Sequence, residues 1–234
     1  MFNRIYCLMG MFMCLFMYSA IGFAQSKNLA PEFTQLPEKP KVVIMPPDVE
    51  LFSMSMGGVR EPRADWTEQA QKHLQQGLMN QRGNLPHQLS ALPIELHDPM
   101  AEISGLHGSV AKSIYLHHIQ SDLNLPTKNG ELRWTLGEAV NELRNQTQAD
   151  YALFVWIRDS YASAERKAAM VAMALLGVGL VGGSQVGYAS LVNLKHGQVV
   201  WFNAMNRPNG DLREAHAAEE TVQALLRNFP RAPS

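Results

Sequence analysis

Two runs of consecutive apolar residues in this chain predict strands buried in a sheet. Residues 41–46 read KVVIMP and residues 151–157 read YALFVWI. Apolar residues in succession, rather than in alternation, are typical of strands that are covered on both faces. A second extended piece is expected over residues 49–56, and a further short strand over residues 94–96.

The clearest local strand signal is a hairpin near the C-terminus. Two extended runs, residues 185–194 and 198–203, are joined by Lys195, His196 and Gly197. A glycine between two such runs is typical of a hairpin turn, because glycine adopts the backbone angles that tight turns require. We therefore expect the two runs to pair as antiparallel neighbours.

Apolar residues at helical spacing predict a first helix over residues 65–83. Asp65 and Glu68 have the spacing of a capping box, in which an acceptor at the helix start and a carboxylate three residues later satisfy the free backbone amides. One apolar stripe follows at four-residue intervals. Its members are Trp66, Ala70, Leu74 and Leu78.

Three further helices are expected. One runs over residues 101–123, where the apolar face changes side, so that the helix either kinks near Tyr115 or is covered on both faces. Another begins at Thr135, which forms a second capping box with Glu138. The last begins at Asp211 and ends before Pro230.

Together these elements predict an α/β fold with a single domain over residues 41–230. Helices and strands alternate and then finish with a hairpin and a helix. The expected architecture is a mixed β-sheet packed with about four helices, followed by a C-terminal β-hairpin plus helix.

The N-terminus predicts an export signal. Arg4 is followed by an uncharged stretch over residues 5–24, and small residues precede the polar residues that come next. This is the pattern of a signal peptide over residues 1–24, although the stretch is also close to the length of a membrane span. We expect a periplasmic protein after cleavage, with a retained inner-membrane anchor as the alternative. Residues 25–40, rich in proline, predict a tether.

Cysteine and charge exclude several functional classes. Cys7 and Cys14 both lie in the signal, so the exported part has no disulfide, thiolate metal site or cysteine nucleophile. Without the signal the charge is 19 − 21 = −2, because Arg4 is lost and no acid is. The remaining chain has no cluster of lysine and arginine, which argues against nucleic acid as a partner and against binding anionic lipid by charge alone.

The chain resembles known envelope α/β domains. The features in question are the first strand VVIMP, the buried strand after Ala149-Asp150-Tyr151 and the hairpin LVNLKHGQVVW. They are similar to those of the CsgG, TolB N-terminal and LpoB types and of related small lipoproteins of unknown function. The resemblance covers roughly residues 41–228 and carries no catalytic residue. It implies protein binding or assembly in the envelope without enzymatic activity.

Residues 168–183 are the most unusual stretch after the signal, since all sixteen are uncharged. One interpretation is a helix buried against the sheet. A second is an insertion between two strands that packs against another subunit, a protein partner or the bilayer, and a third is a mobile glycine-rich lid. Under the second interpretation the interacting side chains are, with Trp66 added from the first helix, Met170, Met173, Leu176 and Leu180.

Motifs for chemistry are weak in this chain. Gly177, Gly179 and Gly182 match the spacing G-x-G-x-x-G, but a strand rather than a helix is expected to follow, so we predict no cofactor. His118 and Asp122 have the spacing of two metal ligands without a third, so we predict no metal site. No catalytic residue is assigned either.

Trp66 and Asp159 have two interpretations each. Trp66 either attaches the first helix to the core or belongs to a recognition loop with the preceding glycines. Asp159 lies just past the end of a buried strand, where α/β sheets often place functional groups, or simply where the strand reaches water.

The function that follows is a non-enzymatic envelope protein that binds a protein partner or self-assembles as a homo-oligomer. The alternative is a periplasmic hydrolase with an unrecognised active site.

Overall fold

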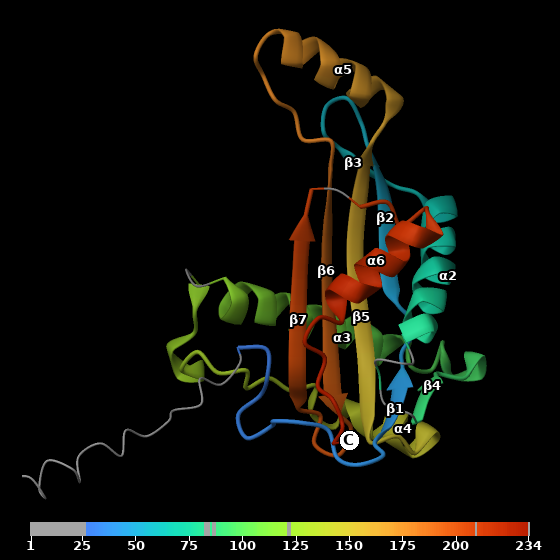
Figure 1. Cartoon of the computed structure of the whole chain (residues 1–234), viewed down its shortest axis with the longest axis vertical. Coiled ribbons are helices and arrows are strands. Elements are labelled where there is room, and N and C mark those ends of the chain that lie inside the picture. Colours follow the sequence, from blue (N-terminus) through green and yellow to red (C-terminus); the bar gives the residue numbers. More distant parts are fainter. Residues whose placement is uncertain (1–26, 82–84, 86–87, 121–122, 209, 234) are drawn as a thin grey trace, which may run out of the picture.

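The computed structural model describes residues 27–81, 85, 88–120, 123–208 and 210–233. The signal predicted over residues 1–24 lies outside them. Over the described residues the chain forms an α/β domain with a curled mixed sheet and five α-helices (Figure 1). The predicted fold class is therefore confirmed, and the helix in addition to the four expected is α5, which begins at Ala164 and extends into the uncharged segment.

The sheet is built around β5 (Tyr151–Ala162). Along one edge it pairs in parallel first with β1 (Lys41–Ile44) and then with β2 (Asp48–Met54), and on the other edge it pairs antiparallel with β6 (Gly183–Asn193). Residues 151–155 are buried on both faces of the sheet, which explains why this run is apolar without alternation.

Further strands complete the two sides of the sheet. On one side β4 (Gln88–Ala91) pairs in parallel with β1, and β3 (Arg60–Pro62) pairs antiparallel with β2. On the other side β7 (Val199–Arg207) pairs antiparallel with β6. The predicted hairpin is thus confirmed. At its turn Gly197 has φ +67°, and a Cβ there would lie 2.2 Å from the Gly137 carbonyl oxygen, so only glycine fits.

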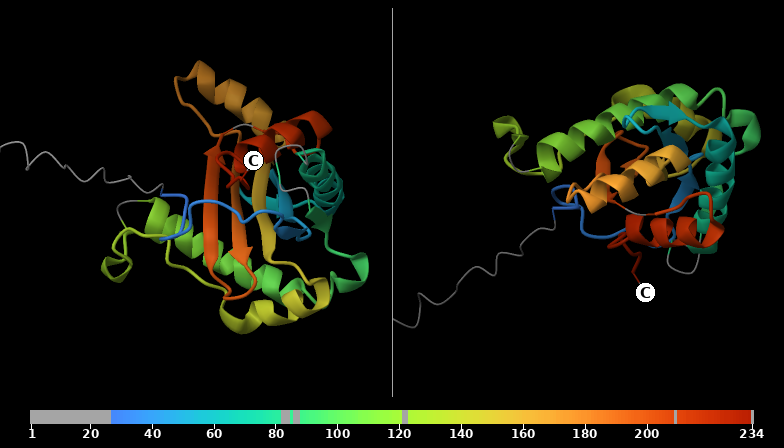
Figure 2. Two further views of the ribbon diagram at one scale, coloured as in Figure 1. Left: turned by 60° about the horizontal axis from the view of Figure 1, so that its bottom comes forward. Right: turned by 90° about the horizontal axis from the view of Figure 1, so that it is seen from above.

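Helices cover both faces of the sheet (Figures 1 and 2). On one face lie α2 (Ala64–Asn80) and α6 (Ala215–Leu225), and on the other α3 (Ala101–Ile114) and α4 (Val140–Thr147). The two cores follow the side-chain alternation of β5: Leu153 and Ile157 face α2 and α6, whereas Ala152 and Phe154 face α3 and α4.

Short helical turns connect these elements. Tyr115–Ile119 continues α3 as a π-helix, which is where the sequence predicts a kink. Three 3₁₀ turns, at Ile94–Leu96, Pro126–Lys128 and Gly137–Ala139, complete the set that the structure describes. The strand predicted over residues 94–96 is therefore wrong, since that position forms a turn and the strand is β4, a few residues earlier.

Neither predicted capping box forms. Helix α2 begins at Ala64 after Arg63, and the Asp65 carboxylate accepts hydrogen bonds from the Arg63 guanidinium at 3.1 and 2.8 Å instead of capping the helix. Thr135 forms an isolated β-bridge with Gln198, and α4 starts only at Val140. Asp65 is thus bound by a residue two positions away, and Thr135 Oγ1 accepts from the Gly137 amide at 2.9 Å instead of capping α4.

The described part of the predicted tether packs onto the domain. The Ala30 amide donates to the Val200 carbonyl at 2.9 Å, so this strip lies along the outer edge of β7. Leu36 is 1% exposed within the core cluster, and its amide donates to the Arg231 carbonyl at 3.1 Å. The folded domain thus includes residues before its predicted start at residue 41.

Helix α5 (Ala164–Leu175) stands apart from these layers. It connects β5 to β6 and extends past the end of the sheet, and from above it lies across that end between the helices of the two faces (Figures 1 and 2).

Candidate interaction surface

Exposed apolar side chains gather at one end of the molecule. Of the nine large hydrophobic residues that are exposed in the described part of the chain, seven lie on α5, on the loop 176–182 after it or on the β2–β3 turn. We call these seven residues the apolar end: Met56, Val59, Val171, Leu175, Leu176, Val178 and Val181. Single exposed apolar residues are ordinary, but a contiguous group is typical of an interaction surface.

Arg166 holds the parts of the apolar end together. Its Nε and Nη2 atoms donate to the Val181 carbonyl at 2.9 and 2.7 Å, and Nη1 donates to the Met56 carbonyl at 3.2 Å. The side chain is buried beneath α5, whose first turn is capped by Ser163. One charged group therefore fixes the loop after α5 and the β2–β3 turn to the base of the helix.

The interaction residues predicted on α5 and its loop differ in their exposure to solvent. Leu176 is 75% exposed and lies in the apolar end. Met170, Met173 and Leu180 are half-buried. Met170 points back toward the loop, where its Cε would lie 3.0 Å from a Cβ on Gly182. Met170 thus packs between α5 and the loop that follows it.

The outward side chains of α5 were not predicted. Val171 and Leu175 are 65% and 85% exposed, and neither was among the expected interaction residues. The helical spacing could have identified them. The charged Lys167 must face water, and Val171 and Leu175 follow it by four and eight positions, which places them on the same face of the helix. Among the described residues, no helix combines the length and the apolar character that crossing a bilayer requires.

Trp66 lies below α5 rather than in the apolar end. Its ring meets that of Tyr161 edge to face at 5.8 Å between centroids. The guanidinium carbons of Arg63 and Arg213 lie 4.3 and 4.7 Å from the ring centroid, so cation–π contacts hold the half-buried ring.

An open groove runs from Trp66 to the base of α5. Its volume is about 700 Å³, and charges of both signs line it, among them Glu61, Glu165 and Lys167. Met56 of the apolar end also lines it. The groove therefore adds a charged flank to the apolar end.

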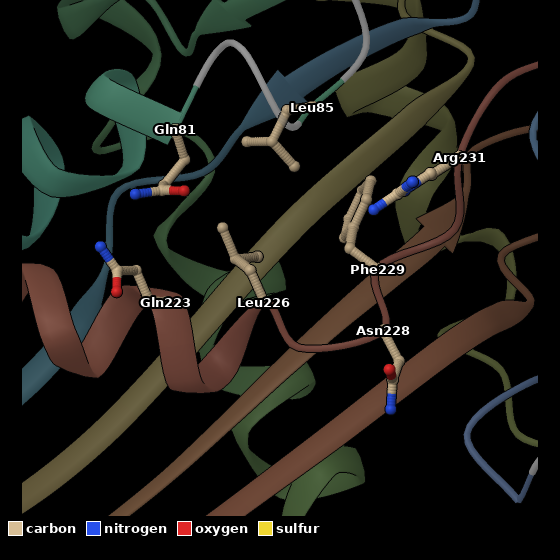
Figure 3. A pocket seen from close by; sticks show the side chains of 7 residues that line it. All are labelled: Gln81, Leu85, Gln223, Leu226, Asn228, Phe229 and Arg231. Atoms are coloured by element: carbon tan, nitrogen blue, oxygen red, sulfur yellow. The ribbon is translucent and has the colours of Figure 1, made fainter. Parts of the chain in front are cut away.

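A second pocket lies at the far end of the α2–α6 layer, with a volume of about 660 Å³ (Figure 3). Its lining side chains are three carboxamides, three apolar groups and one guanidinium. They are Gln81, Gln223 and Asn228, then Leu85, Leu226 and Phe229, and finally Arg231. Such a set can donate and accept hydrogen bonds, but these seven residues offer no acid–base pair for catalysis.

Asp159 belongs to a buried polar row across three strands. Gln185 lies opposite Asp159 on β6, and Arg207 lies opposite Gln185 on β7. Gln185 Nε2 donates to Asp159 Oδ2 at 2.5 Å, and Arg207 Nε donates to Gln185 Oε1 at 2.7 Å. Arg207 Nη2 donates to Thr221 Oγ1 of α6 at 2.5 Å. The row attaches α6 to the sheet.

Asp159 is therefore enclosed rather than emerging into water. Burial raises its pKa to about 6, although hydrogen bonds from Tyr161 and Gln185 act in the opposite direction. The Tyr161 hydroxyl donates to Asp159 Oδ2 at 2.6 Å and accepts from the Leu212 amide at 2.7 Å. Burial and the neighbouring Asp159 carboxyl also raise the pKa of Tyr161.

The two buried histidines have structural partners. His107 is stacked on Phe154 with centroids 4.6 Å apart, its Nε2 lies 2.8 Å from Ser190 Oγ, and burial lowers its pKa to about 3. His118 Nε2 lies 2.7 Å from the Lys27 carbonyl oxygen. No group of three potential metal ligands occurs among the described residues, and Asp122, which the sequence pairs with His118, lies outside them.

The glycines of the G-x-G-x-x-G match lie in the loop that follows α5. That loop leads into β6, as the sequence predicts, and not into a helix. The arrangement of a helix N-terminus over a pyrophosphate is therefore not formed there.

Comparisons with known proteins give distant structural neighbours. No protein-family model and no curated protein matches the chain. The PelC dodecamer from Paraburkholderia phytofirmans is 13% identical with a TM-score of 0.36, over 83% of this chain and 93% of that one. The LpoB C-terminal domain from Salmonella enterica is 11% identical with a TM-score of 0.29, over 76% and 87%.

A lipoprotein from Neisseria meningitidis is 10% identical with a TM-score of 0.33, over 81% of this chain and 97% of that one. These neighbours are proteins of the envelope lipoprotein kind, and the similarity to each is weak in both structure and sequence. The LpoB type occurs both among them and in the resemblance drawn from the sequence.

Proposed function

We propose that this chain is a non-enzymatic protein of the bacterial envelope that binds a protein partner, or further copies of itself, through the apolar end. The observation that carries the proposal is the exposure of aliphatic side chains on a projecting helix and loop. Leu175 and Leu176, at the C-terminal end of α5, are 85% and 75% exposed. Helix α5 itself lies beyond both helix layers (Figure 1).

The energetic argument concerns apolar area. Complete burial of a leucine or valine side chain contributes about 1.5–3 kcal/mol. A partner that covered Val171, Leu175 and Leu176 would gain several such contributions. Because Arg166 already holds the surrounding loops, little conformational entropy would be lost on binding.

The location in the envelope rests on the sequence. The uncharged stretch over residues 5–24 and the absence of cysteine after Cys14 both fit export into an oxidising compartment. The periplasm is the proposed location, with retention of the first segment as an inner-membrane anchor as its variant.

The hydrolase alternative has less support. The pocket of Figure 3 presents carboxamides and one arginine, and the perturbed carboxyl of Asp159 is enclosed by Gln185 and Tyr161. A hydrolytic site needs a nucleophile or base that substrate can reach.

The test is in-cell cross-linking of the full-length chain, tagged at its C-terminus, followed by purification from the envelope fraction and mass determination. We expect a discrete species larger than the monomer. The double variant Val171→Glu with Leu175→Glu should remove it while the monomer stays folded, because both side chains already face water.

The matched control is Leu106→Glu, which places the same charge at an exposed leucine of α3, outside the apolar end. It should leave the larger species intact. An unchanged cross-linking pattern in the double variant would contradict the proposal, provided that circular dichroism shows the variant to be folded.

A further inference from the structure

Helix α5 carries an apolar stripe on its outer side as well as its inner one. The inner side is formed by Ala169, Met170 and Met173, which are half-buried. The outer stripe repeats at intervals of four, three and four residues, which is the spacing of a helix–helix seam. Its members, all exposed, are Ala164, Ala168, Val171 and Leu175. A helix that is apolar on opposite sides is normally covered on both.

Size and charge along the stripe favour a second α5 as the covering element. In an antiparallel pair with a two-fold axis midway between positions 171 and 172, Ala168 of each copy lies opposite Leu175 of the other, so that a small side chain faces a large one. Lys167 of each copy then lies near the C-terminal end of the other α5, whose own last turn contains no basic residue. A cation there interacts favourably with the helix dipole.

We infer that α5 pairs with α5 of a second copy of this chain, antiparallel and with Val171 beside the two-fold axis. The inference rests on the proposed function and specifies its partner. A two-fold interface uses the same surface on both molecules, so it requires a patch that is complementary to itself, and the outer stripe meets that requirement.

Cysteine cross-linking of the full-length chain tests this arrangement. With Cys7→Ser and Cys14→Ser as background, Val171→Cys should give a disulfide-linked homodimer under mild oxidation, because the two copies of residue 171 meet beside the axis. Ala164→Cys should not, since its two copies would be about 20 Å apart along the helix at 1.5 Å per residue, far beyond disulfide reach.

A double variant provides the positive control for register. Ala168→Cys with Leu175→Cys should cross-link as efficiently as Val171→Cys, whereas either single change should yield at least tenfold less homodimer. Equal homodimer from Ala164→Cys and Val171→Cys would indicate a parallel pair and overturn the inference.

The remaining outcomes separate this inference from the proposed function. If Val171→Cys gives no homodimer while Val171→Glu with Leu175→Glu still removes a complex with a different protein, the inference fails and the proposed function stands. Flotation of the chain with phospholipid vesicles, abolished by the same glutamates, would show a membrane as the occupant and overturn the inference. If the glutamates remove no complex and Val171→Cys gives no homodimer, both fail.

Discussion

Arg166 and Val181 are joined by two hydrogen bonds from one guanidinium to one carbonyl oxygen, at 2.9 and 2.7 Å. Arg166 lies in the first turn of α5, and Val181 lies two residues before β6. The contact thus closes the whole excursion of the chain between β5 and β6. A projection that leaves the sheet is thereby fixed at its base, although most of its own apolar surface faces water.

Arg166→Met should therefore loosen the projection. The change leaves the carbonyls of Val181 and Met56 without the donor that now satisfies them, and loss of hydrogen bonds to a charged group costs about 1.5–3 kcal/mol. We expect a lower free energy of unfolding in urea and faster proteolysis within residues 176–182. Lys167→Met, an exposed neighbour, is the control and should change neither; equal proteolysis of the two variants would refute the clamp.

Leu36→Ala should show that the strip before β1 belongs to the core. Leu36 is 1% exposed, and removal of a buried leucine side chain costs about 2–5 kcal/mol. Leu106→Ala, at a leucine that is 37% exposed, should cost less than about 1 kcal/mol. Urea unfolding of both variants measures the difference, which would vanish if the strip were a free linker.

Much of the sheet follows from the sequence because its signals are strong and local. The continuous apolar run that starts at Tyr151 can be stable only where both faces are covered, and it became the central strand. The hairpin was identified by Gly197, whose backbone conformation other residues rarely adopt. By contrast, β4 has only four residues, none fully buried, so its position depends on pairing with β1 and not on its own pattern.

The candidate surface was predicted in its segment but not in its residues. An uncharged stretch shows that residues 168–183 are unusual, yet composition alone does not reveal which side of a helix faces the body. Arg166 determines that orientation through its hydrogen bonds to Val181 and to Met56 of the β2–β3 turn. One of these partners follows α5 in the sequence and the other precedes it by about a hundred residues, so no local pattern reveals the contact. Likewise, Asp65 would cap α2 only if Arg63 did not bind it first.

Two helical glycines should respond oppositely to alanine. Alanine is favoured over glycine in a helix interior by about 1 kcal/mol. A Cβ on Gly105 of α3 would meet nothing within 4 Å, so Gly105→Ala should raise the free energy of unfolding by about 0.5–1 kcal/mol. A Cβ on Gly77 would lie 3.2 Å from Val222 Cγ2, where α2 crosses α6. Gly77→Ala should therefore lower the free energy of unfolding measured in urea. Equal stabilities of Gly77→Ala and Gly105→Ala would show that the α2–α6 contact accommodates the added methyl group without cost.

Asp159 and His107 should give stability opposite dependences on pH. The pKa of Asp159 is about 6 in the folded chain against 3.8 as a free group, so the folded state holds the proton more tightly and its contribution weakens as pH rises from about 4 to 6. The pKa of His107 is about 3 against 6.5, so the folded state holds that proton less tightly and stability is lost as pH falls below about 6.5.

Between about pH 4 and 6 the two slopes have opposite signs and a similar size, about 1.4 kcal/mol per pH unit, so they largely cancel in the natural chain. Asp159→Asn removes one of them, and its unfolding free energy should fall more steeply than that of the natural chain as pH is lowered through this window. His107→Gln removes the other and should give a shallower fall or a rise. Urea unfolding at half-unit intervals from pH 4 to 7 measures these slopes, with Leu106→Ala, which removes no titratable group, as a control that should run parallel to the natural chain. Because slopes are compared, the packing lost with either side chain displaces a whole curve and leaves its slope unchanged. Parallel curves for Asp159→Asn and the natural chain would mean that this carboxyl is already ionised in the folded protein at pH 5.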